Sequence, residues 1–206
     1  MALYRVKAGD GIAWITGSSS GIGRALAVQM AREGYTVAAT ARSEDKLRSL
    51  SQEAEGLKGS IIPFPCDVTD RDAMAGLVEK IEAEAGSVTL AVFNAGNYFP
   101  THGEAMRLDN FIKTYEINTL GVLHGLVPVV ERMKAAGRGQ VVFVGSVSGY
   151  SGLPAASAYG ASKAALNNMA ESLLFDFEKM NIRTLVVNPG FIDTLLTEKN
   201  DFAMPA

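Results

Sequence analysis

Short apolar runs rich in β-branched residues alternate along the chain with longer segments in which apolar residues recur at helical spacing. The runs that predict strands are Ile12–Thr16, Tyr35–Ala41, Ser60–Phe64, Val88–Phe93, Gln140–Gly145 and Arg183–Val187. Several of these runs are apolar on both faces, which is typical of strands in a parallel sheet that helices cover on both sides. The pattern therefore predicts an α/β fold with a doubly wound parallel sheet, which binds its ligand beyond the carboxyl ends of the strands.

Helical spacing covers about residues 22–33, 104–136 and 155–180, and another helix is expected to begin after Thr69. The segment 104–136 contains Gly121, Gly125 and Pro128, so we expect it to bend or break near these residues. No repeat or linker interrupts the alternation of strands and helices. With 206 residues, the chain is expected to form a single domain.

Composition and charge narrow the class of protein. The chain has 19 basic and 22 acidic residues, a net charge of −3, and no dense run of Lys or Arg, which argues against binding to nucleic acid. A single cysteine, Cys66, excludes an intrachain disulfide, and with only His102 and His124 beside it no metal site is expected. No signal peptide and no membrane span are indicated, so a cytoplasmic location is expected.

Glycine is over-represented, with 21 residues, and the glycines gather after the first predicted strand, in the segment Thr16-Gly17-Ser18-Ser19-Ser20-Gly21-Ile22-Gly23. Glycines there allow positive φ and a close approach of the backbone to a pyrophosphate, while the following helix offers N–H donors. The spacing is wider than in the G-x-G-x-x-G fingerprint. The alternative is an ordinary Gly/Ser loop, but its place between a strand and a helix favours a dinucleotide site.

The end of the second predicted strand indicates which dinucleotide is preferred. An acidic residue at this place accepts the ribose hydroxyls of NAD, whereas an arginine accommodates the 2′-phosphate of NADP. Here Arg42 and Ser43 follow the strand, and Glu44 and Asp45 fall in the first turn of the next helix. Arg42, with Ser43 as a second donor, therefore favours NADP(H) over NAD(H); the alternative is a surface arginine.

Tyr159 and Lys163 are four residues apart on the last predicted helix, so both lie on the same face of that helix. A nearby cation can lower the pKa of a tyrosine by about 1–3 units, which makes the phenol a usable general acid and base. Ser146 follows the fifth predicted strand and could fix the reacting oxygen. The pair alone is weak evidence, because such spacing also arises by chance on a helix surface.

From about Ile12 to Thr194 the chain resembles the short-chain dehydrogenase/reductase family. The resemblance rests on the glycine segment, Asn94-Ala95-Gly96 after the fourth strand, Asn118, Ser146, Tyr159 with Lys163, and Pro189-Gly190 followed by Ile192 and Thr194. It implies a Rossmann-type NAD(P)-binding domain that passes a hydride between nicotinamide and a carbonyl or alcohol carbon.

The resemblance also implies roles for these residues. Tyr159 would exchange the proton, Lys163 would lower its pKa and hold the nicotinamide ribose, Ser146 would bind the substrate oxygen, and Asn118 would hold Lys163 through water. The cofactor site implied comprises Gly17, Ser19, Ser20, Gly21, Ile22, Gly23, Arg42, Ser43, Asp67, Val68, Asn94, Ala95, Gly96, Tyr159, Lys163, Pro189, Gly190, Ile192 and Thr194. Asp67 and Val68 would flank the adenine, and the segment 189–194 would wrap the nicotinamide end.

Three further expectations concern the surroundings of the site. Aromatic and aliphatic residues near the motifs could line an apolar substrate pocket: Tyr98, Phe99, Tyr150, Leu153, Phe191 and Leu195. An apolar stripe on the last helix either packs into the core or, as family analogy favours, forms a homodimer or homotetramer seam; its residues are Met169, Leu173, Leu174 and Phe177. The resemblance finally implies a substrate-covering segment, a further helix and a seventh strand, which we expect to lie beyond residue 206.

The preferred hypothesis is thus an NADP(H)-dependent carbonyl reductase or alcohol dehydrogenase whose substrate is a small carbonyl or alcohol compound. One alternative is a protein of the same fold that binds dinucleotide as a sensor or scaffold without turnover. Another is an epimerase or dehydratase that uses the same tyrosine and lysine. The combination of Asn118, Ser146, Tyr159 and Lys163 favours the enzyme that transfers hydride.

Overall fold

A computed structural model describes residues 3–194 and 197. Six strands form one sheet in the order β3-β2-β1-β4-β5-β6, and each pair of neighbours is parallel. The strands are β1 (Ile12–Thr16), β2 (Thr36–Thr40), β3 (Ser60–Pro63), β4 (Val88–Phe93), β5 (Gly139–Val144) and β6 (Ile182–Val187). The predicted doubly wound parallel sheet is confirmed, and every strand end lies within one residue of its predicted position.

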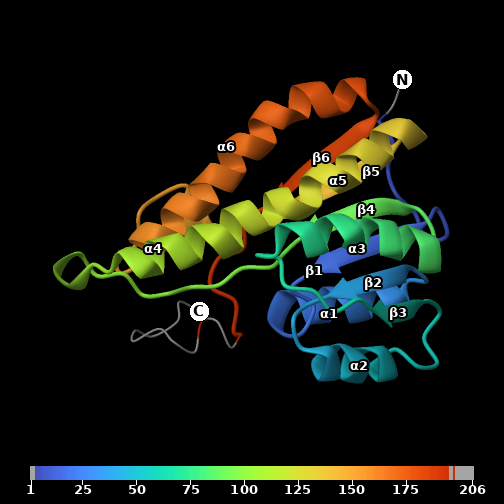
Figure 1. Cartoon of the computed structure of the whole chain (residues 1–206), viewed down its shortest axis with the longest axis horizontal. Coiled ribbons are helices and arrows are strands. Elements are labelled where there is room, and N and C mark those ends of the chain that lie inside the picture. Colours follow the sequence, from blue (N-terminus) through green and yellow to red (C-terminus); the bar gives the residue numbers. More distant parts are fainter. Residues whose placement is uncertain (1–2, 195–196, 198–206) are drawn as a thin grey trace.

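Helices cover both faces of this sheet (Figure 1). The helices α1 (Gly21–Arg32) and α2 (Glu44–Glu53) pack on one face. The helices on the other side are α3 (Arg71–Glu84), α4 (Leu108–Tyr115), α5 (Gly121–Ala136) and α6 (Ser157–Lys179). Each face therefore has its own apolar core. The sheet is buried between them except along β6, where Leu185 and Val187 are each 43% exposed.

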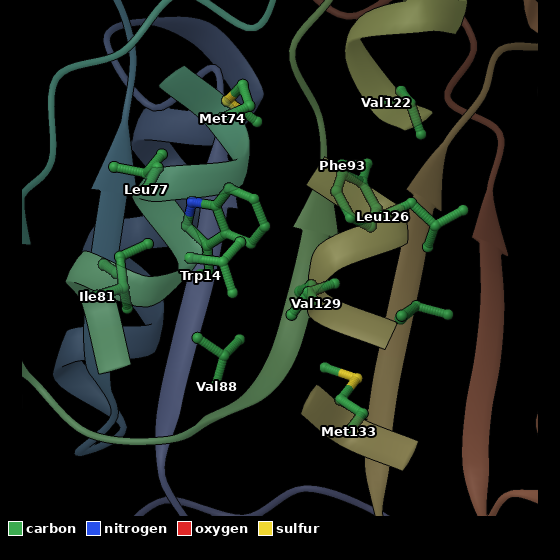
Figure 2. Packing of buried hydrophobic residues seen from close by; sticks show 14 of the residues in the cluster. Trp14, Met74, Leu77, Ile81, Val88, Phe93, Val122, Leu126, Val129 and Met133 are labelled. Carbon is green, nitrogen blue, oxygen red and sulfur yellow. The ribbon is translucent and has the colours of Figure 1, made fainter. Parts of the chain in front are cut away.

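The larger core is centred on Trp14 of β1, which is fully buried (Figure 2). Its ring meets Phe93 of β4 edge to face, with 5.8 Å between centroids, and its indole N–H donates to Thr40 Oγ1 at 2.9 Å. A Cβ added at Gly125 of α5 would lie 2.7 Å from the Trp14 ring. The glycine is thus needed for close packing of α5 on the sheet.

The expected break in the segment 104–136 lies elsewhere in the structure. The helix α5 continues through Pro128, and the irregular part is a π-helical turn over Glu116–Leu120, between α4 and α5. Gly121 and Gly125 lie inside α5, where they let neighbouring side chains approach, so their presence did not indicate a helix break. The π-helical turn carries Asn118, and such widened turns are frequent at functional sites.

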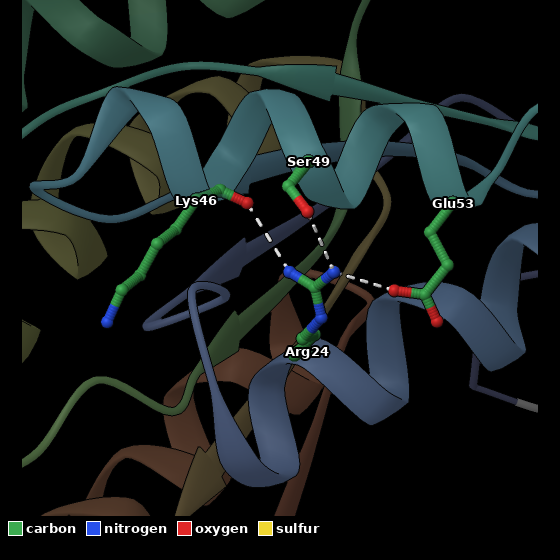
Figure 3. Close-up of polar contacts among 4 residues, drawn as sticks. All are labelled: Arg24, Lys46, Ser49 and Glu53. Atoms are coloured by element: carbon green, nitrogen blue, oxygen red, sulfur yellow. Dashed lines mark hydrogen bonds and ion pairs between the residues drawn. The ribbon is translucent and has the colours of Figure 1, made fainter.

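The helices α1 and α2 are joined at the surface by Arg24 (Figure 3). Its guanidinium donates to the carbonyl of Lys46 at 3.3 Å, to Ser49 Oγ at 3.4 Å and to Glu53 Oε2 at 2.7 Å. Both helices begin next to the carboxyl ends of β1 and β2. The contact therefore fixes the relative position of two helix N-termini at the edge of the sheet where a ligand is expected.

Candidate active site

A cleft of about 980 Å³ opens at the carboxyl ends of the strands, at the upper end of the size range of small-molecule sites. Its walls come from the segments after β1, β2, β3, β4, β5 and β6 and from α4 and α6. The sheet order reverses beside β1, which lies between β2 and β4. The cleft is thus placed where parallel sheets of this topology bind their ligands.

The turn after β1 lines one wall of the cleft, and Gly17 and Gly21 in it have φ of 73° and 55°. A Cβ at Gly17 would lie 2.7 Å from Ala95 Cα, and a Cβ at Gly23 would clash with Asn94 Nδ2. Gly17 and Gly21 are thus needed for their positive φ. Gly17 and Gly23 also allow the turn to pack against the segment that follows β4. Gly23 itself does not line the cleft.

Asn94 joins the ends of β1 and β4. Its Nδ2 donates to the carbonyls of Thr16 and Gly17 at 3.1 and 3.2 Å, and its backbone N–H donates to Thr16 Oγ1 at 3.1 Å. The side-chain amide of Asn94 therefore stabilises the start of the glycine turn, and the residue also lines the cleft.

At the far end of the cleft from α6, Arg42 follows β2 and Asp67 follows β3. The Arg42 side chain is 74% exposed, and its Nη1 lies 4.0 Å from Asp67 Oδ2. Ser43 accepts a hydrogen bond from the Lys46 backbone N–H at 3.4 Å and thereby caps α2. Because the ion pair is long and exposed, Arg42 remains available to a stronger anion.

Lys163 is buried beneath the other end of the cleft, and only 3% of its surface is exposed. Its ammonium donates to the Val144 carbonyl at the end of β5 at 2.8 Å and lies 5.7 Å from the centre of the Tyr159 ring. Burial lowers the pKa of Lys163 from 10.5 to about 8. Its Nζ also lies 3.4 Å from the position of a Cβ on Gly96, so it reaches the cleft floor.

Ser146 occupies the turn between β5 and α6. Its backbone N–H donates to Asn188 Oδ1 at 2.8 Å, and its Oγ accepts from the backbone N–H and the hydroxyl of Ser148 at 3.2 and 2.9 Å. Since its hydroxyl accepts two bonds from Ser148, its own proton is directed elsewhere. Ser146 also lies close enough to Tyr159 to lower the pKa of its phenol, so the two predicted catalytic residues are neighbours.

The pKa of Tyr159 is raised from its usual value, because burial outweighs the lowering effect of the nearby Ser146 hydroxyl. The sequence led us to expect that Lys163 lowers this pKa. In the protein alone the ammonium faces the Val144 carbonyl, and the desolvation of the phenol dominates. The Tyr98 ring contributes to that environment, since it meets the Tyr159 ring edge to face at 5.6 Å.

Asn118 is fully buried in the π-helical turn and does not line the cleft. Its Oδ1 accepts from the Asn97 backbone N–H at 2.8 Å, and its Nδ2 donates to the Asn97 carbonyl and to Ser162 Oγ, both at 3.0 Å. The Asn118 side chain therefore connects the segment after β4 to α6. A link through water to Lys163 stays a prediction.

The structure brings almost all of the predicted site residues to this cleft. Those that line it are Gly17, Ser19, Ser20, Gly21, Ile22, Arg42, Ser43, Asp67, Val68, Asn94, Ala95, Gly96, Ser146, Tyr159, Lys163, Pro189, Gly190, Ile192 and Thr194. Of the candidates for a substrate pocket, Phe99 lies in the cleft lining, and Leu195 is outside the described residues.

Sequence reasoning missed Lys46, Cys66, Asn97, Lys113 and Glu116, which also line the cleft. Lys113 and Glu116 are three residues apart and line the cleft from α4 and the π-helical turn. Their spacing relative to each other, i and i+3 on a predicted helix, was a usable signal. Cys66 is half-buried at the cleft wall, and burial raises the pKa of its thiol.

The residues present fit a dinucleotide. The first backbone N–H groups of α1 face the cleft, and the Ser20 side chain makes no capping hydrogen bond to them, so these donors suit a pyrophosphate. At Gly190 a Cβ would meet nothing within 4 Å, so the backbone there borders open space. Within residues 3–194 and 197, no helix is long and apolar enough to cross a membrane.

The fold is of the Rossmann type, and its cleft is lined by a glycine turn that suits phosphates and by Tyr159, Lys163 and Ser146. Together, fold and site define a nucleotide-binding oxidoreductase. Residues 11–203 match the family model described as short chain dehydrogenase. The chain belongs to this family, whose members are NAD(P)-dependent oxidoreductases that act on CH–OH groups.

Relatives and solved structures agree with this assignment. The chain is 36% identical over 193 residues to an uncharacterized oxidoreductase of Myxococcus xanthus, with 94% of this chain and 76% of the relative covered. It is 38% identical over 185 residues to the 3-oxoacyl-[acyl-carrier-protein] reductase FabG of Thermotoga maritima, with 90% and 75% covered. A short-chain type dehydrogenase/reductase from Mycobacterium marinum superposes with a TM-score of 0.87 at 31% identity, with 93% and 77% covered.

Two further similar structures hold different cofactors. A xylitol dehydrogenase with NAD⁺ bound has a TM-score of 0.84 at 27% identity, with 90% of this chain and 72% of that chain covered. A variant of ElxO with NADPH bound has a TM-score of 0.86 at 25% identity, with 92% and 77% covered. The fold therefore accommodates both dinucleotides, and the preference of this chain depends on its own residues.

The burial of Lys163 leads to a prediction about stability. Between pH 8 and 10.5 the unfolded chain binds the proton that the folded chain has lost, so the wild type gains stability as pH rises through this window. Across this window the pKa shift of Lys163 changes the free energy of unfolding by on the order of 3 kcal/mol. Lys163→Met removes this dependence, so the stability of the wild type relative to the variant should increase between pH 7 and pH 10. Denaturant unfolding of both proteins at both pH values measures this difference in the free energy of unfolding. A difference that is the same at pH 7 and pH 10 would contradict the prediction.

Proposed function

We propose that the protein transfers a hydride between NADP(H) and a carbonyl or secondary alcohol, with Tyr159 as the general acid and base. The observation that carries the proposal is the convergence of Tyr159, Ser146 and Lys163 at one end of the dinucleotide cleft. The bound nicotinamide supplies or accepts the hydride. The protein must hold the substrate oxygen and exchange one proton with it.

Three side chains divide this work. Ser146 is held by Asn188 and Ser148, and its hydroxyl, which lies near Tyr159, can fix the substrate oxygen beside the phenol. In reduction, Tyr159 gives its proton to that oxygen as the carbonyl carbon receives the hydride, and in oxidation it takes the proton back. Lys163 offers a positive charge close to the phenolate that forms, which favours its release of the proton.

Arg42 supports NADP(H) as the preferred cofactor. It lies in the cleft lining directly after β2, mostly exposed and engaged only in a long ion pair with Asp67. A guanidinium can hold a 2′-phosphate with two parallel hydrogen bonds, and that interaction is much stronger than an exposed pair at 4.0 Å.

The substrate is proposed to be an apolar carbonyl compound, because aromatic and aliphatic side chains surround the catalytic end of the cleft. Tyr98 packs on Tyr159, Phe99 lines the cleft, and Tyr150 and Leu153 are exposed on the segment between Ser146 and α6. A relative named as a 3-oxoacyl-[acyl-carrier-protein] reductase supports a carbonyl substrate for this fold.

A panel of aldehydes, ketones and quinones tests this proposal, with the consumption of NADPH followed by its absorbance. We expect turnover with apolar ketones or aldehydes and none without a carbonyl compound. A wild-type protein that binds NADPH but turns over no member of the panel would favour the sensor or scaffold instead.

A further inference from the structure

His124 lies outside the cleft but contacts the segment that forms one of its walls. Its Nδ1 lies 2.9 Å from the carbonyl oxygen of Val68. Because a carbonyl oxygen can only accept a hydrogen bond, Nδ1 must carry the proton and donate. His124 is in α5, and Val68 is in the segment Cys66–Thr69 between β3 and α3, so the bond joins two elements that are 56 residues apart.

Gly121, one turn before His124 on the same face of α5, contacts the same residue. A Cβ at Gly121 would lie 2.9 Å from Val68 Cγ2 and 3.2 Å from the Val68 carbonyl oxygen. The helix α5 therefore holds Val68 at two points. The Val68 side chain packs against Gly121, and the Val68 carbonyl accepts a hydrogen bond from His124. Val68 is 9% exposed, so its carbonyl has little access to water as a replacement partner.

The segment held in this way carries groups of the cleft wall. Asp67 accepts from the backbone N–H and the hydroxyl of Thr69 at 3.0 and 2.9 Å, and it faces Arg42 at 4.0 Å. The backbone N–H of Cys66 donates to the Ala41 carbonyl at 3.1 Å, which ties the start of the segment to the end of β2. His124 provides the corresponding tie on the other side of Asp67.

We propose that His124 is a positioning residue for dinucleotide binding: through the Val68 carbonyl it holds the segment Cys66–Thr69, and with it Asp67, in the place that the cofactor requires. The proposal rests on the proposed cofactor function and adds a residue that does not touch the cofactor. The imidazole N–H acts through one hydrogen bond, and the hydride transfer at Tyr159 lies at the other end of the cleft.

Two variants separate this hydrogen bond from the bulk of the side chain. In His124→Asn the amide nitrogen occupies the place of Nδ1 and can still donate to Val68, whereas in His124→Gln it extends toward the place of Nε2. The Kd for NADPH, measured by fluorescence titration, should rise about tenfold in His124→Gln, or about 1.4 kcal/mol, and less than twofold in His124→Asn. Glutamine is the better helix former, so helix stability alone predicts the opposite order.

A second readout does not involve the cofactor. Amide hydrogen exchange in the protein without NADPH should become faster at residues 66–70 in His124→Gln and stay near the wild-type rate in His124→Asn. Saturating NADPH should restore a kcat close to that of the wild type, since the chemistry is untouched. Equal Kd values in wild type and His124→Gln would overturn the proposal. A wild type that binds no NADPH would instead overturn the proposed function.

Discussion

The Tyr159→Phe variant is expected to lose about two to four orders of magnitude in carbonyl-dependent NADPH oxidation while its Kd for NADPH stays within twofold of the wild type. The substitution removes one hydroxyl and leaves the ring in its place against Tyr98, at 5.6 Å between ring centres. Without the hydroxyl, no group remains beside Ser146 to give a proton to the oxygen of the reduced substrate. Steady-state rates and a fluorescence titration of NADPH measure the two quantities.

Tyr35→Phe is the matched control, because it makes the same chemical change next to the smaller apolar core and outside the cleft lining. Its turnover should equal that of the wild type. The comparison also separates the classes of function: a sensor or scaffold has no need for the Tyr159 hydroxyl. Undiminished turnover in Tyr159→Phe would therefore remove this tyrosine from the proposed mechanism.

The cofactor half of the site could be predicted from the sequence because each of its parts is local. The turn between β1 and α1 needs positive φ at Gly17 and Gly21, and only a few residue types meet that need. The carboxyl ends of parallel strands lie at one edge of the sheet. Arg42 follows β2 and Asp67 follows β3, so their proximity could be expected once these strands were identified.

The parts that the sequence did not predict depend on contacts between distant segments. The position of Ser146 is set by Asn188, which is 42 residues away. The π-helical turn at Glu116–Leu120 follows no propensity signal, and it places Asn118 where its amide can bind Asn97 and Ser162. No pattern in one sequence reports such pairings, since each partner alone is an ordinary polar residue.

The difference between local patterns and distant contacts also explains why the expected lowering of the Tyr159 pKa was wrong for the folded protein. Spacing on α6 placed Lys163 on the same face as the phenol, and the structure agrees. Spacing could not show that the ammonium would bind the Val144 carbonyl or how deeply the phenol would be buried. The balance between desolvation and charge is a property of the packed site, and it sets the direction of the pKa shift.

Arg42→Ala is expected to weaken NADPH binding by about ten- to a hundredfold, because one or two charge-assisted hydrogen bonds to the 2′-phosphate are lost. NADH lacks this phosphate, so its Kd should change by less than twofold. The variant should therefore lose most of the discrimination between the two cofactors. Titrations of both dinucleotides measure this directly, and the effect on NADPH should shrink at high salt because Arg42 is exposed.

Arg48→Ala controls for the change in net charge. Arg48 lies on α2 close to Arg42 in sequence, but it is paired with Glu44 at 2.6 Å and Asp45 at 3.8 Å and does not line the cleft. Its removal should leave both Kd values nearly unchanged. If Arg42→Ala weakened NADPH and NADH equally, the arginine would support the adenosine end in general, and the proposed preference for NADP(H) would be wrong.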